Sequence, residues 1–143
     1  MVGWVEKHIG TPHPDKTVVL SGMAFKGNPE TSDLRGSSSV YIAQKLYQKG
    51  YKLLLHDFVA SPQEVAALGL GECVDDLDRA CESASALCVL NNHRKYSGAA
   101  LTTALKRDDF PVLDTWGACA ELRTSGKKAY WTFGNMLIEG EHL

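Results

Sequence analysis

The sequence lacks the features that mark several special classes of protein. Its four cysteines contain no C-x-x-C pair, which argues against a zinc ribbon and against a thioredoxin-type dithiol. No apolar run approaches the length of a membrane span, and the opening MVGWVEKHIG has no apolar signal-peptide core. We therefore expect a cytoplasmic protein with no membrane partner, in which Cys73, Cys81, Cys88 and Cys119 are reduced and structural.

Neither sign of charge dominates the chain. Fifteen Lys and Arg against 17 Asp and Glu give a net charge of -2 at pH 7. Such a chain has no bulk attraction to nucleic acid, so we expect no nucleic-acid partner, and any anion site must be local. The 143 residues, 44% of them hydrophobic, suit one globular domain.

Short aliphatic runs alternate with segments of helical spacing. Five runs are predicted to be strands: 17–22, 51–57, 86–91, 111–115 and 128–133. Four segments are predicted to be helices: 38–49, 61–68, 74–83 and 96–106. Strands with apolar centres separated by helices indicate a doubly wound, Rossmann-like α/β fold, with a parallel sheet of about five strands and helices on both faces.

The first sixteen residues differ from the rest of the chain. Trp4, Val5 and Ile9 precede two prolines, Pro12 and Pro14, which is typical of a helix end and a linker. We expect residues 1–16 to be the end of a helix and a linker from a missing upstream part. Residues 17–143 are then expected to form the α/β domain.

Ligands of open parallel sheets bind beyond the carboxyl ends of the strands, where the strand order reverses. The predicted connections at that edge are 22–35, 56–58, 91–95 and 114–119. The first is the longest and contains Lys26 and Arg35, followed by serines 37–39, which suits an anion near a helix start. It lacks the lysine-hydroxyl pair of a Walker loop and the spacing of a dinucleotide fingerprint. The alternative is a plain loop in which Lys26 is solvated, Arg35 pairs with Asp33, and the serines only cap.

The string GMAFKGNPETSDLRGSSSVYIAQKLYQKGYKLLLHD resembles the start of the C-terminal domain of the UDP-glucose/GDP-mannose dehydrogenase family. That family's pattern has G-x-A-F-K, then D-x-R-x-S, a helix ending in Gly, and a strand ending in Y-D-P. The matching positions here are Gly22, Ala24, Phe25, Lys26, Asp33, Arg35, Ser37, Gly50 and Asp57. Three later segments, ASALCVLNNHRKY, PVLDTWG and AYWTFGN, are similar to the family in the same order, so the resemblance covers about residues 17–135.

The resemblance implies a function for the whole protein. Members of the family are NAD-dependent oxidoreductases that oxidise C6 of a nucleotide-linked sugar from alcohol to carboxylate, giving a uronate used in polysaccharide biosynthesis. NAD would be bound by an N-terminal domain, and the catalytic cysteine would lie in a central helical part. For this chain the resemblance therefore implies no catalytic residue, no metal and no cofactor of its own. Its implied partners are a nucleotide-diphosphate sugar, the upstream domains and, in the full-length protein, a second subunit of a homodimer.

The resemblance also implies substrate-binding residues. Phe25 and Lys26 match the family's F-K pair beside the nucleotide sugar, and Arg35 belongs to the same loop. Trp116 stands where the family usually has arginine after D-T; an indole stacks on a ring but makes no bidentate contact with an anion. We expect Trp116 to be partly exposed at the mouth of the site.

Two further positions depart from the family, and other interpretations stay open. Gly36 replaces the usual Glu, and Phe58 replaces the proline after Y-D. Gly36 and Trp116 favour, as an alternative, a non-catalytic α/β module with an assembly or regulatory role. A third hypothesis, a metal or hydrolase cluster of His93, Asp114 and Cys119, has strand-end positions in its favour but no spacing signature.

Overall fold

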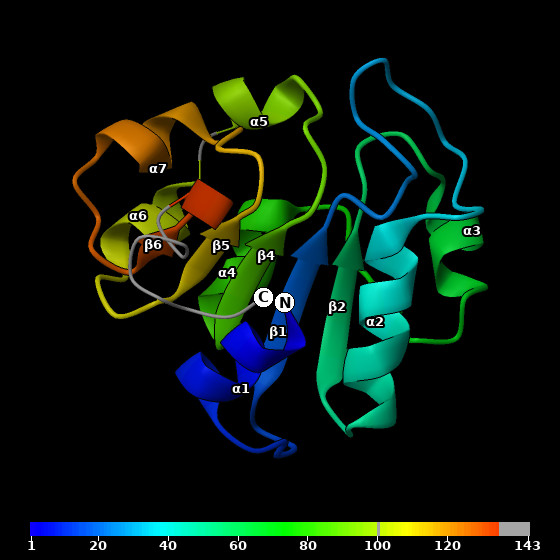
Figure 1. Ribbon diagram of the computed structural model, residues 1–143, viewed down its shortest axis with the longest axis horizontal. Coiled ribbons are helices and arrows are strands. Elements are labelled where there is room, and N and C mark those ends of the chain that lie inside the picture. The colour runs from blue at the N-terminus through cyan, green and yellow to red at the C-terminus, as the bar shows by residue number, and fades with distance from the viewer. Residues whose placement is uncertain (100, 135–143) are drawn as a thin grey trace.

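The protein is described by a computed structural model over residues 1–99 and 101–134. Within these residues six strands form one sheet in the order β3-β2-β1-β4-β5-β6, and every neighbouring pair is parallel (Figure 1). The strands are β1 (Thr17–Ser21), β2 (Lys52–His56), β3 (Glu72–Cys73), β4 (Ala86–Val89), β5 (Val112–Asp114) and β6 (Tyr130–Trp131). The predicted doubly wound α/β fold is confirmed. The strand order reverses between β1 and β4.

Helices cover both faces of the sheet. The described helices are α1 (Val2–Ile9), α2 (Ser38–Gln48), α3 (Pro62–Ala66), α4 (Leu77–Ser83), α5 (Lys95–Gly98), α6 (Thr102–Lys106) and α7 (Ala120–Thr124). Val18 and Leu20 of β1 share a buried cluster with α1, α2 and α3, whereas Val19 lies in a second cluster with α4 to α7. Because successive strand residues point to opposite faces, one aliphatic run supplies two cores.

The first helix belongs to the same packed core. Trp4 and Val5 of α1 are buried against β1, and the ring of Trp4 lies 5.8 Å from that of Trp131 in β6. The expected division between residues 1–16 and 17–143 stays a prediction. Residues 135–143 of that expected domain, including the last residue of AYWTFGN, lie outside the described residues.

Local signals explain where the helices begin and end. The Ser37 hydroxyl accepts the Ser39 N–H at 3.2 Å at the start of α2, and Gly50 follows its end with φ of 97°. Ser61 and Glu64 form a reciprocal capping box on α3, with Pro62 in its first turn. No helix in the described ranges has both the length and the apolar character needed to cross a bilayer.

Three elements differ from the sequence-based expectation. The segment 96–106 divides into α5 and α6. Five residues apart in one continuous helix, Tyr96 and Leu101 would point about 140° away from each other around the helix axis. The break allows both side chains to be buried. The two-residue strand β3 was not predicted, since it is too short to carry a period and exists through pairing with β2. Helix α7 was not predicted either, and of its five residues only Leu122 is buried.

Candidate functional site

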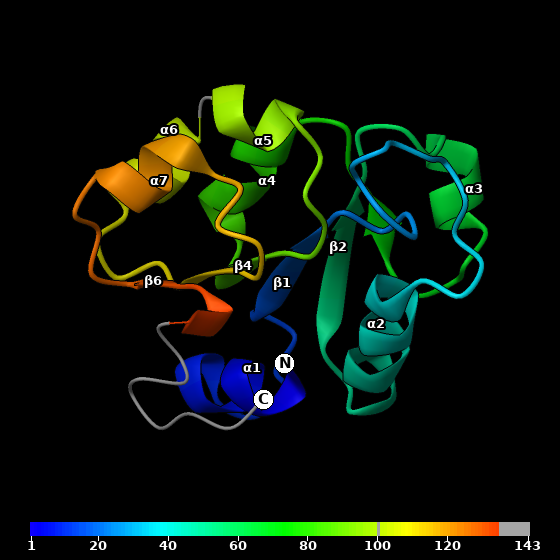
Figure 2. The same cartoon turned by 45° about the horizontal axis from the view of Figure 1, so that its top comes forward.

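The connections after β1 and β4 meet where the strand order reverses, and Figure 2 shows both rising from the same edge of the sheet. Gly22 follows β1 with φ of 95°, and a Cβ at this position would lie 2.7 Å from the backbone nitrogen of Asn91. A Cβ at Gly27 would lie 2.6 Å from the Cα of His93. The two loops therefore touch backbone to backbone, which only glycine permits at these two points.

The base of the loop after β1 is held by hydrogen bonds from three directions. The Ala24 N–H donates to Oδ2 of Asp57 at 2.8 Å, and the Ser37 hydroxyl donates to the carbonyl of Met23 at 2.7 Å. The Phe25 N–H donates to the carbonyl of Asp33 at 2.7 Å. Phe25 and Lys26 consequently extend from a fixed stretch of backbone.

The far end of this loop is bound to the loop after β4. The Lys95 N–H donates to Nδ1 of His93 at 3.1 Å, which leaves the proton on Nε2, and Nε2 donates to Oε2 of Glu30 at 2.7 Å. This hydrogen bond is the main cause that lowers the pKa of Glu30 from its ordinary value. His93 is buried and its ring also packs on Phe58, so the contact holds the loop after β1 against the loop after β4.

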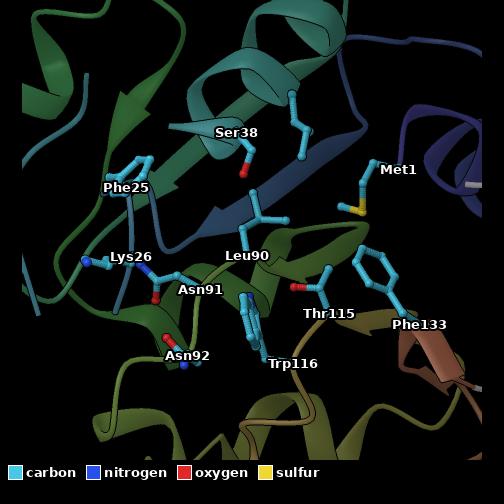
Figure 3. Close-up of a pocket in the computed structure, with 11 residues that line it drawn as sticks. Met1, Phe25, Lys26, Ser38, Leu90, Asn91, Asn92, Thr115, Trp116 and Phe133 are labelled. Carbon is cyan, nitrogen blue, oxygen red and sulfur yellow. The ribbon is translucent and has the colours of Figure 1, made fainter. Parts of the chain in front are cut away.

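Between these loops and the turn after β5 lies a cavity of about 310 Å³ (Figure 3). Phe25 and Lys26 line it from the first loop, Leu90 and Asn91 from the segment just after β4, and Trp116 from the turn after β5. A volume of this size is at the lower end of the range found for small-molecule sites. The cavity brings together three of the four side chains that the sequence predicted for substrate binding: Phe25, Lys26 and Trp116.

Trp116 stands on a firmly held turn. The buried carboxylate of Asp114 accepts the N–H groups of Ala118 and Cys119 at 3.0 and 2.8 Å, and the hydroxyl of Tyr130 donates to it at 2.7 Å. Burial, followed by the hydrogen bond to Asp114, raises the pKa of Tyr130. The Trp116 side chain itself is 63% exposed, which confirms the expected exposure.

The sequence of this chain matches a known protein family. The UDP-binding domain of the UDP-glucose/GDP-mannose dehydrogenase family matches residues 19–121. The chain belongs to this family. No curated protein sequence is similar enough to this chain to count as a match.

Solved structures agree on the fold. A UDP-glucose dehydrogenase from the hyperthermophilic archaeon Pyrobaculum islandicum superposes with a TM-score of 0.71 over 90% of this chain, at 24% identity. The UDP-N-acetyl-mannosamine dehydrogenase from S. aureus gives 0.64 over 88% of this chain, at 18% identity. The chain spans 27% and 28% of the lengths of those two proteins.

Arg35, the fourth predicted site residue, lies outside the cavity lining. Its Nε and Nη2 donate to the two carboxylate oxygens of Asp33, each at 3.0 Å, and its side chain is 91% exposed. These hydrogen bonds are the main cause that lowers the pKa of Asp33 and raises that of Arg35. The structure thus has the pairing that the alternative interpretation of this loop proposed.

Two departures from the family pattern have structural explanations. Gly36 has φ of 66°, a left-handed conformation that disfavours Glu. Phe58 packs edge to face on His56 and on Tyr96, with ring centres 4.7 and 4.8 Å apart. Phe58 therefore builds an aromatic layer with His56 and Tyr96 that a proline would not supply.

Sequence reasoning missed a buried polar network close to this layer. The Ser21 hydroxyl at the end of β1 lies 2.7 Å from Nδ1 of His56 and 2.6 Å from the Tyr96 hydroxyl. Burial lowers the pKa of His56 to about 4 and raises that of Tyr96, so both are neutral near pH 7. The sequence shows polar residues at these strand ends. It gives no local signal for the contact between Ser21 and Tyr96, because 75 residues separate them.

The hypothesis of a metal or hydrolase cluster finds no support. His93 pairs with Glu30, whereas Asp114 ends β5 and accepts the N–H of Cys119 from the turn that follows. No three or more His, Cys, Asp or Glu within residues 1–99 and 101–134 are arranged to hold a metal ion. All four thiols are free, and burial raises the pKa of each, to about 12 for Cys81 and Cys88, which disfavours the reactive thiolate.

The loop after β1 does not fit the pyrophosphate of NAD. A dinucleotide site needs its glycine turn to open directly into a helix, so that the ligand meets free N–H groups. Here a long loop separates Gly22 from α2, and the Ser37 hydroxyl already accepts the Ser39 N–H at the helix start. We therefore assign no step of cofactor chemistry to this cavity.

Proposed function

We propose that this chain binds a nucleotide-diphosphate sugar in the cavity after β1, β4 and β5. It would do so as the C-terminal UDP-binding domain of an NAD-dependent nucleotide-sugar 6-dehydrogenase. The observation that carries the proposal is that Phe25, Lys26 and Trp116 all line one cavity at the point of strand-order reversal. The family membership of residues 19–121 points in the same direction.

The residues have separate roles in this proposal. The Lys26 ammonium supplies a mobile cation for diphosphate oxygens, and Phe25 supplies an apolar wall beside it. The amides of Asn91 and Asn92 add hydrogen-bond donors and acceptors on the same side of the cavity as Lys26 (Figure 3). Arg35 contributes only if it exchanges Asp33 for the ligand's phosphate.

The whole enzyme would oxidise the C6 alcohol of its sugar to a uronate, with UDP-glucose, UDP-N-acetylmannosamine or GDP-mannose as the substrate class. NAD and the catalytic cysteine would belong to other parts of a cytoplasmic, homodimeric protein, and the product would enter polysaccharide biosynthesis. This chain would hold the substrate's nucleotide end. We expect no NAD reduction by the chain alone, because its four thiols are buried or unactivated and the β1 loop fits no dinucleotide.

Isothermal titration calorimetry tests the binding role directly. The chain is titrated with UDP, GDP, UDP-glucose, GDP-mannose and, as a control, glucose. We expect binding of a nucleoside diphosphate and none of glucose. Incubation with NAD and the same nucleotide sugars, followed by absorbance of NADH, tests the second expectation. Failure of every nucleotide to bind would overturn the proposed function, and turnover that survives repurification would overturn the assignment of the cofactor site.

One observation favours a second candidate, a non-catalytic module with an assembly or regulatory role. With Arg35 held by Asp33 and Trp116 in place of the family's arginine, Lys26 is the one Lys or Arg side chain among the described residues that line the cavity. A single basic side chain is a weak match for two phosphates. The same titration separates the candidates, because only the first requires nucleotide binding.

A further inference from the structure

We infer that Trp116 is the stacking platform for the nucleobase of the ligand, so that the base ring, rather than a second charged contact, anchors the nucleotide. The inference rests on the proposed function and assigns one end of the ligand to one part of the cavity. Its basis is the exposure of the indole, the rigidity of the turn that carries it, and the distribution of polar groups around it.

Trp116 differs from the other two tryptophans in its surroundings. Trp4 is 1% exposed, and the ring of Trp131 packs within 5.8 Å of Trp4 and 4.3 Å of His8. Trp116 is 63% exposed although it lines a cavity. An indole that leaves so much of its ring open beside a cavity offers a ready surface for another ring.

The turn beneath Trp116 is already ordered. The residue before it, Thr115, donates its hydroxyl to the Val89 carbonyl at 2.9 Å, and its N–H donates to the same oxygen at 3.1 Å. Beyond it, the Asp114 carboxylate holds the N–H groups of Ala118 and Cys119. Binding a ring on Trp116 therefore requires little further ordering of the backbone, which favours affinity.

Polar groups lie unevenly around the indole. In Figure 3, Lys26, Asn91 and Asn92 lie to one side of Trp116, and Phe133 and Met1 lie to the other. An anionic group would bind on the side of Lys26, which leaves the indole and its apolar neighbours for the uncharged ring. This placement orients the ligand with its diphosphate toward Lys26.

The surroundings of Trp116 suit a base better than a hexose. A hexose carries several hydroxyls that need partners around its edge, whereas Leu90 and Phe133 offer none. Thr115 uses its proton on Val89, so its oxygen only accepts, which matches a ring N–H of uracil or guanine. Base–aromatic stacking is also tolerant of which base is stacked.

The test compares Trp116→Leu, Trp116→Phe and a matched control, Tyr47→Leu, which removes an exposed aromatic of α2 that does not line this cavity. Each protein is titrated by calorimetry with UMP, UDP, pyrophosphate and glucose 1-phosphate. We expect Trp116→Leu to weaken UMP and UDP by the same factor, about ten- to a hundredfold, and to leave pyrophosphate unchanged. Trp116→Phe should retain most of the affinity, and Tyr47→Leu should match the wild type.

Other results of these titrations would overturn either the stacking role of Trp116 or the proposed function. Unchanged UMP and UDP affinities in Trp116→Leu overturn the stacking role and leave the proposed function in place. A loss confined to glucose 1-phosphate makes Trp116 a sugar contact and also overturns the inference. Absence of all nucleotide binding in the wild type overturns the proposed function and the inference together. Quenching of the exposed Trp116 emission by UMP, lost in Trp116→Leu, is the expected spectroscopic signature.

Discussion

Nε2 of His93 donates a hydrogen bond of 2.7 Å to Oε2 of Glu30, although 63 residues separate the two side chains in sequence. His93 is buried, whereas Glu30 is half exposed. The contact joins the loop that carries Phe25 and Lys26 to the loop after β4, on which Asn91 and Asn92 lie. The geometry of the cavity therefore depends on a contact that neither loop makes by itself.

Replacing Glu30 with Gln removes the charge but keeps the shape. We expect faster hydrogen exchange of the backbone amides in residues 23–33, because the loop loses its charged acceptor for His93. Mass spectrometry of exchange at pH 7 measures this, with Glu64→Gln on α3 as the control. Equal exchange in Glu30→Gln and the wild type would contradict a role of this contact in holding the loop.

We also expect the effect of the Glu30–His93 hydrogen bond on the loop to depend on pH. The pKa of Glu30 is lowered from 4.5, chiefly by the hydrogen bond from His93. The contribution of the Glu30 carboxylate to stability is therefore complete above pH 4.5. It is lost as the pH falls through the lowered pKa that Glu30 has in the folded protein. The difference in loop protection between wild type and Glu30→Gln should vanish at the lowest pH. A difference that persists there would contradict the assignment.

Gly27 is required by the close approach of the two loops. An alanine Cβ at this position would overlap the backbone nitrogen and Cα of His93, so the loops must separate. We expect Gly27→Ala to lower the free energy of unfolding by about 1–3 kcal/mol, measured by urea denaturation. Gly98→Ala is the matched control, because a Cβ there meets no atom within 4 Å. Equal stability of the two variants would contradict the packing argument.

Lys26 is the side chain on which the diphosphate contact depends. We expect Lys26→Ala to weaken UDP binding by about one to two orders of magnitude, because a charge-assisted hydrogen bond is lost. Calorimetry with UDP and UMP measures the change, and the larger loss should be for UDP. Lys52→Ala, which removes an exposed lysine at the start of β2, serves as the control. Unchanged affinity in a folded Lys26→Ala protein would reject the role.

Because His56 is buried, we expect the folded protein to lose stability in mild acid. Burial lowers its pKa to about 4, whereas in the unfolded chain it takes up a proton near pH 6.5. The unfolded state thus binds more protons between these values, and stability falls as the pH drops from 6.5 to 4, by about 3 kcal/mol. Urea denaturation at pH 7 and pH 4.5 should show a smaller pH dependence for His56→Gln than for the wild type. The exposed His13→Gln variant should behave like the wild type, and an unchanged pH dependence in His56→Gln would contradict the assignment.

Part of the candidate site could be predicted because parallel sheets bring all their strand carboxyl ends to one edge. Phe25 and Lys26 follow β1 and Trp116 follows β5, so a topological rule was enough to place them near one another. Arg35 could not be placed by that rule, because Asp33, two residues away, competes for its guanidinium. The outcome of that competition depends on backbone geometry that residue spacing does not report.

The sequence by itself determined the alternation of strands and helices, the α/β class and the edge of the sheet at which a ligand would bind. These features arise from apolar periodicity and from glycine and proline, which act over a few residues. Only the tertiary structure decided that β3 forms beside β2, that 96–106 breaks so that Tyr96 and Leu101 are both buried, and that Glu30 meets His93. The reason is physical: the latter depend on contacts between distant segments, whose free energy exists only once the chain has brought them together.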